Sequence, residues 1–222
     1  VSEFFHFEVS RKHTPSSDES FKRFLAHSPS VRSFYLRVLS LKKVLHVSDS
    51  EAPEIIRTIL DDYDFIGITE RLDESAVVLA MLLDVPVGDV LYLNAKTNGG
   101  YDDGAYQNTC QFIQPSHVSP GMQEYFQSKE WIAKSKWDDL LYRVANRSLD
   151  LTIDLLGREK FNENMEKFQQ AQRLARERCL AEEIFPCTST GEQNSKASCL
   201  WADSGCGYKC LDNIARELSL SY

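Results

Sequence analysis

The chain has 222 residues, of which 42% are hydrophobic and 11% aromatic, so it can bury a core and is neither disordered nor fibrous. Acidic residues outnumber basic ones by 33 to 25, and the resulting net charge of −8 argues against general binding to nucleic acids or anionic membranes. The longest apolar run, residues 76–83, is far shorter than the roughly 20 residues of a membrane-spanning helix.

The start of the chain predicts that it is a processed or truncated piece of a longer protein. It begins at Val1, directly before the aromatic segment 4–7, and shows no signal-peptide pattern. Residues 2–46 are predicted to be helices separated by turns, because Phe21 and Leu25 repeat at helical spacing.

Two short segments are predicted to be parallel strands. Residues 63–69 are β-branched and aromatic and are bounded by acids, which is typical of a buried strand. The segment 48–54 before it carries the start signals of a helix, an apolar helix follows at 75–83, and residues 90–93 are the next predicted strand. Strands that alternate with helices indicate an α/β fold with a parallel sheet.

The second half of the chain is predicted to be helical after a long loop. Residues 94–118 are rich in Asn, Gly and Asp, and loops of this length are functional or disordered. Ser119 and Pro120 restart a helix, a helix over about 138–156 ends at Gly157, and a polar amphipathic helix follows over 158–180.

Disulfides are predicted to order the C-terminal region, because residues 187–207 are too polar to fold by burial alone. A zinc site is the disfavoured alternative, since there is no Cys-x-x-Cys pair and no histidine after His117. We expect local pairs among the last five cysteines, with one partner left for the first. The six predicted disulfide cysteines are Cys110, Cys179, Cys187, Cys199, Cys206 and Cys210.

Disulfides imply an oxidising lumen or the exterior of the cell. The sequon at Asn146 agrees with a secretory setting, although it falls in a helical pattern. The predicted organisation is therefore an incomplete α/β domain over residues 1–178 with a Cys-rich extension over 179–222 packed on it.

Few residues are candidates for chemistry. Glu70 and Arg71 follow the first predicted strand, and Lys96 and Thr97 follow the second, where open α/β sheets bind their ligands. We interpret Glu70 or Arg71 as substrate-orienting and Lys96 with Thr97 as phosphate-binding. The structural alternative is that Arg71 pairs with a nearby acid and that Lys96 lies in a solvated loop. The five histidines lack metal-ligand spacing, so no metal is expected.

Two segments resemble a known family. Residues 65–79, with Thr69, Glu70 and the run Asp73-Glu74-Ser75, and residues 89–94, with Asp89, Val90 and Tyr92, are similar to segments of the Golgi carbohydrate sulfotransferases. The galactose 3-O and uronyl 2-O types are nearest. The Cys-rich stretch 199–210 resembles sulfotransferase-like proteins of algae and related protists.

The resemblance implies the C-terminal part of a P-loop-like α/β sulfotransferase fold, with short parallel strands among predominant helices and a disulfide-rich tail. It implies transfer of a sulfuryl group from 3′-phosphoadenosine 5′-phosphosulfate to a carbohydrate hydroxyl in the Golgi lumen. The family's cofactor-gripping segment is expected before Val1, as is any membrane anchor, so this chain alone is expected to be inactive.

A different function class stays open beside the enzyme. The chain is alternatively a non-catalytic sulfotransferase-like scaffold, an interaction subunit of a larger assembly in an organelle lumen or outside the cell. The lack of a cofactor-binding segment in this sequence favours the alternative. Its partners would be protein subunits rather than a sugar acceptor.

Overall fold

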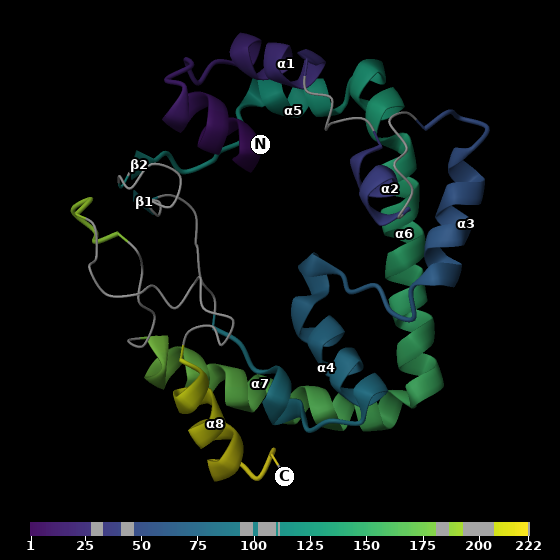
Figure 1. The fold of residues 1–222 in the computed structure, drawn as a ribbon, viewed down its shortest axis with the longest axis vertical. Helices are drawn as coiled ribbons and strands as arrows, with labels where there is room; N and C mark the ends of the chain where they lie inside the picture. The colour runs from purple at the N-terminus through teal and green to yellow at the C-terminus, as the bar shows by residue number, and fades with distance from the viewer. Residues whose placement is uncertain are drawn as a thin grey trace. The chain divides into compact units, whose positions relative to one another are not determined.

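The computed structural model of the chain describes residues 1–27, 33–40, 47–93, 100–101, 110, 112–180, 187–192 and 207–221. Helices account for most of this part (Figure 1). The contacts divide the chain into two compact units. Unit 1 comprises Val1–Pro15, Leu72–His117 and Leu155–Tyr222, and unit 2 comprises Ser16–Arg71 and Val118–Asp154.

Unit 2 is built from helices that enclose an aliphatic core. In that core α2 packs against α3, and the buried side chains are Leu36, Ala52, Ile56, Ile59 and Leu141. The α1 and α5 helices lie side by side (Figure 1). The elements are α1 (Asp18–His27), α2 (Phe34–Leu39), α3 (Ala52–Asp62), the 3-10 turn η3 (Thr69–Arg71), α5 (Pro120–Phe126) and most of α6 (Lys129–Leu156).

Unit 1 is centred on α7 (Arg158–Arg178). The helices α4 (Leu72–Leu83) and α8 (Tyr208–Glu217) and the 3-10 helix η4 (Val87–Val90) all pack against α7 (Figure 1). Val77 and Val78 of α4 and Phe168 of α7 are fully buried. The N-terminal π-helix η1 (Phe4–Arg11) packs against β2 (Phe112–Ile113).

The predicted helix boundaries at prolines, caps and glycine are confirmed. The start signals in 48–54 place Pro53 in the first turn of α3. Gly157 separates α6 from α7 with a φ of 96°, which glycine adopts more easily than any residue with a Cβ. These signals act within a few residues of the boundary, so they are readable without the tertiary structure.

The predicted start of a helix at Ser119 is confirmed. Ser119 also contacts a residue of another helix that the sequence does not reveal. The Ser119 side chain caps α5 by accepting the N–H of Met122, and its hydroxyl donates to the Asp18 carboxylate of α1. A Cβ on Gly121 would overlap that carboxylate, so glycine lets Asp18 approach the start of α5. This contact joins α1 to α5.

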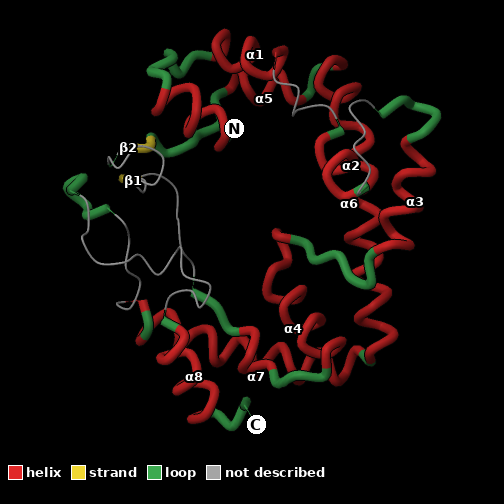
Figure 2. Tube along the Cα trace, in the orientation of Figure 1, coloured by secondary structure: helices red, strands yellow, loops and turns green. Residues whose placement is uncertain are grey.

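The predicted parallel strands are wrong for the described residues. Residues 63–68 form a loop and residues 87–90 form η4, which takes in the start of the predicted strand 90–93 (Figure 2). The backbone at Tyr63 and at Leu91 is extended, but among the described residues neither segment has a neighbouring strand to complete a ladder. The sheet within the described residues is an antiparallel ribbon of β1 (Gly100–Tyr101) and β2, and it does not bear out a P-loop-like sheet.

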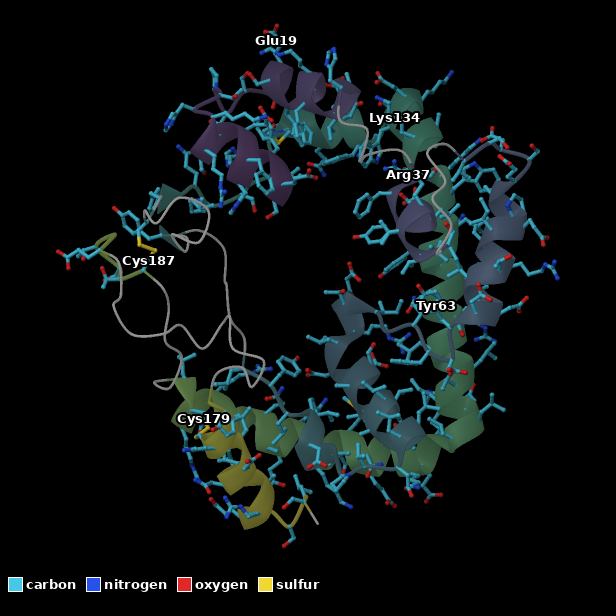
Figure 3. The ribbon with its side chains drawn as sticks, viewed as in Figure 1. Glu19, Arg37, Tyr63, Lys134, Cys179 and Cys187 are labelled. Atoms are coloured by element: carbon cyan, nitrogen blue, oxygen red, sulfur yellow. A yellow bond between two sulfur atoms is a disulfide. The ribbon has the colours of Figure 1, made fainter. Side chains whose placement is uncertain are left out.

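Two disulfides lie among the described residues of unit 1, which confirms oxidation of four of the predicted cysteines. Cys110 pairs with Cys187, and Cys179 at the end of α7 pairs with Cys210 in α8. Figure 3 labels Cys179 and Cys187, which are 0% and 6% exposed. The prediction for Cys199 and Cys206 falls outside the described residues. The described part of the 179–222 extension belongs to unit 1 together with α4 and α7.

Candidate functional site

The first candidate pair, Glu70 and Arg71, lies in η3 of unit 2. Glu70 is exposed, whereas the side chain of Arg71 is only 22% exposed. The Nη1 atom of Arg71 lies 2.9 Å from Oδ1 of Asp150 and donates to Oδ1 of Asn146 at 2.8 Å. Both acceptors are on α6, one helical turn apart. Arg71 therefore fastens η3 to α6.

This geometry supports a structural role for Arg71. Asp150 neutralises the guanidinium, and the hydrogen bond from Arg71 to Asn146 adds a second acceptor on the same helix. Sequence reasoning placed the partner of Arg71 among the neighbouring acids, whereas Asn146 lies 75 positions away. The only available signal was the i, i+4 spacing of Asn146 and Asp150, which puts both on one face of a helix.

We predict that Arg71→Met lowers the free energy of unfolding by about 1–2 kcal/mol, because it removes the cation that pairs with the partly buried Asp150 carboxylate. Asp150→Asn should lower the free energy of unfolding by less in the Arg71→Met background than in the wild type. Urea unfolding of the four proteins of this cycle measures the coupling. The matched control is Arg57→Met in the exposed Arg57–Glu54 pair, which should lower the stability far less than Arg71→Met does. A loss of stability no larger than that of the control would contradict the structural role.

The sequon asparagine, Asn146, lies within α6 and is half-buried. Its side-chain oxygen accepts the hydrogen bond from Arg71 described above. A glycan would attach to the other side-chain atom, Nδ2, so this hydrogen bond does not occupy the acceptor nitrogen. Glycosylation at Asn146 stays a prediction.

Another polar contact, this one in unit 1, links the two segments that carry the family resemblance. The hydroxyl of Tyr92 donates to Oδ1 of Asp73 in α4 at 2.5 Å. The Tyr92 ring also packs against Phe168 of α7, with 6.3 Å between the ring centroids. Sequence reasoning used both polar residues as parts of a motif and missed that they touch.

The surroundings of Tyr92 keep its hydroxyl protonated. Burial, followed by the hydrogen bond to Asp73, raises the pKa of Tyr92 to about 12. At neutral pH the group is therefore a hydrogen-bond donor and not a base. Its geometry suits a positioning residue that holds the start of α4 against the segment after η4.

Comparison of the chain with family models, with curated proteins and with solved structures finds no match. Function therefore has to be argued from the residues themselves.

The other candidates are not brought together by the described structure. Lys96 and Thr97 lie outside the described residues, so their phosphate-binding role stays a prediction. Within the described ranges, no group of three or more His, Cys, Asp and Glu side chains could hold a metal ion. In the same part of the chain, no helix is both long enough and apolar enough to cross a membrane. The two disulfides indicate an oxidising compartment, in the lumen of an organelle or outside the cell.

Proposed function

We propose that the chain is the C-terminal part of a carbohydrate sulfotransferase with a P-loop-like fold, working in the Golgi lumen. The observation that carries the proposal is the hydrogen bond between Asp73 and Tyr92. Each residue belongs to one of the two segments that resemble the family, and both residues lie in the parts of these segments that belong to unit 1. The disulfides support a lumenal setting.

The described residues do not fit the anionic cofactor, 3′-phosphoadenosine 5′-phosphosulfate. A site for several phosphate and sulfate charges needs converging cations, and Arg71, the candidate cation described here, is already balanced by Asp150. In this proposal the described helices supply scaffold, with Asp73 and Tyr92 as positioning residues. The cofactor contact is assigned to Lys96 and Thr97, which follow the segment that holds Tyr92 in the sequence.

The test is transfer of labelled sulfate from the cofactor to galactose- and uronate-containing oligosaccharides by the full-length protein. We predict transfer, and we predict that Lys96→Ala weakens adenosine 3′,5′-bisphosphate binding by about 1.5–3 kcal/mol without changing the melting temperature. The piece with residues 1–222 alone should bind this nucleotide weakly or not at all in calorimetry. Absence of both transfer and nucleotide binding in the folded full-length protein would refute the proposal.

A second candidate, a non-catalytic interaction subunit, is favoured by the outer face of α4. Leu72, Leu79 and Leu83 repeat at helical spacing and are 46%, 37% and 62% exposed, while the opposite face of α4 is buried against α7. A helix that is apolar on both faces is typical of one covered on both sides. The transfer assay separates the two candidates, because a subunit of this kind shows none.

A further inference from the structure

The outer face of α4 (Figure 1) carries an apolar stripe of four residues, Leu72, Ala76, Leu79 and Leu83, which we call the α4 stripe. Their spacing of four, three and four residues places them along one line on the helix. The three leucines are exposed and Ala76 is half-buried. Apolar side chains that follow one line of a helix ordinarily pack against another element, because their exposure to water costs free energy.

The rest of α4 is packed into unit 1. Ser75, Val77, Val78 and Ala80 are buried, and α4 packs against both α7 and η4. The backbone that carries the α4 stripe is therefore ordered before any partner arrives. Binding to such a preformed face does not have to offset the entropy of folding the helix itself.

The spacing of the α4 stripe indicates that the element packing on it is a helix. Residues at i, i+4, i+7 and i+11 form the seam along which the side chains of two helices interdigitate. Ala76 is small and lies between Leu72 and Leu79, so a large apolar side chain of a facing helix can insert there. A strand presents its side chains with a period of two and matches such a seam poorly.

Charge and size argue that this helix belongs to a different polypeptide. Asp73 and Glu74 lie at the start of the α4 stripe, and Asp84 lies directly after its end. Two copies of α4 would place acid beside acid in either orientation, and each chain carries a net charge of −8. Four residues are also far fewer than the roughly 20–30 that each partner contributes to a stable interface. A basic partner helix that binds weakly fits both observations.

We propose that the α4 stripe binds one amphipathic helix of a partner polypeptide, with leucines at the same spacing and lysine or arginine at both ends. Apolar contact supplies the affinity, and the flanking charges supply the selectivity. The inference rests on the interaction-subunit candidate, whose partner it specifies. The two are tested apart, because sulfate transfer would refute that candidate, whereas loss of helix binding alone would refute only the partner.

The probe is a fluorescein-labelled, alanine-rich helical peptide of about 15 residues, with leucines at this spacing and two lysines at each end. We expect saturable binding to the full-length protein with a Kd below about 1 mM. A peptide of the same composition with its leucines at every second position should bind at least about tenfold more weakly, because they do not share a helix face. A version with glutamates in place of the lysines should also bind more weakly, and this difference should shrink at high salt.

Three variants test the protein side of the contact. Leu79→Glu, in the middle of the α4 stripe, should weaken probe binding at least about tenfold, and Leu83→Glu at its exposed end should act in the same direction. The matched control is Leu155→Glu, which makes the same change at an exposed leucine of α6 and should stay within about twofold of the wild type. Unchanged melting temperatures show that the variants fold. If a stripe variant does not fold, the other variant and the rearranged peptide still provide the test.

Three results would overturn the proposal. Absence of saturable binding below about 1 mM would exclude the α4 stripe as a docking site. Binding that is unchanged in both stripe variants, or equally strong for the rearranged peptide, would mean that the probe is held elsewhere or without a helical seam. Dimerisation of the full-length protein that Leu79→Glu abolishes would assign the stripe to a second copy of this chain.

Discussion

Replacing Cys179 and Cys210 together with alanine should lower the free energy of unfolding by about 3–4 kcal/mol. The disulfide closes a loop with a sequence separation of 31 and joins the end of α7 to α8. Without it, the unfolded chain gains conformational freedom, and α8 is held to α7 mainly by the buried side chains of Leu211, Ile214 and Ala215. Urea unfolding measures the loss, and hydrogen exchange should show that the amides of α8 open first.

The second disulfide provides the comparison. Removing Cys110 and Cys187 should cost slightly more, because that bridge closes a longer loop, with a sequence separation of 77, and the loop-closure entropy grows only slowly with loop length. The exchange of α8 should then stay close to that of the wild type, since neither cysteine lies in α7 or α8. Peptide mapping without reduction should recover both linked pairs. Alkylation of any of these four cysteines in the denatured, unreduced protein would contradict the assignment and would move the chain to a reducing compartment.

The helices of this protein were predictable because their signals are local. Pro53, Ser119 and Gly157 each act on the nearest turn of the chain, and the structure places boundaries at all three. The two predicted strands failed for the opposite reason. A strand is completed by hydrogen bonds to a neighbour, and no property of residues 63–69 states where that neighbour is.

The candidate site was predictable only as a set of residue types. Glu70 and Arg71 were picked out as polar residues that follow a predicted strand, but Asn146 and Asp150, which give Arg71 its structural role, lie far along the chain. The contact between Asp73 and Tyr92 likewise requires α4 and the segment after η4 to pack on α7. Tertiary contacts decide which polar residues meet, and a single sequence records them weakly.

The start of α2 shows how strongly such a distant contact can act. This helix has six residues, its preceding residue Ser33 has a φ of 50°, and no side chain of its own caps it. The carboxylate of Asp138 on α6 accepts the main-chain N–H groups of residues 34, 35 and 36 at 2.7, 3.1 and 3.3 Å. Asp138 therefore does the work of an N-cap from 104 positions away.

We predict that Asp138→Ala lowers the free energy of unfolding by about 2 kcal/mol, because three N–H groups at the start of α2 lose their acceptor. Asp138→Asn keeps one oxygen in place and should lose about half as much at neutral pH. The matched control is Asp139→Ala, since Asp139 neighbours Asp138 in sequence and, within the described residues, accepts a hydrogen bond from the side chain of Ser135 instead of from α2. That control should change stability by less than about 1 kcal/mol.

The pH dependence of these variants tests which physical effect dominates at Asp138. Burial raises the pKa of its carboxyl group, although the N–H groups of α2 act in the opposite direction. A raised folded pKa means that the folded state binds the proton first, so the ionised group costs stability above that pKa. The cost is relieved as the pH falls from the raised pKa toward the unfolded value of about 3.9. The stability of the wild type relative to Asp138→Asn should therefore increase over this window. A relative stability that falls with decreasing pH would show that the three hydrogen bonds outweigh burial and that the pKa of Asp138 is lowered.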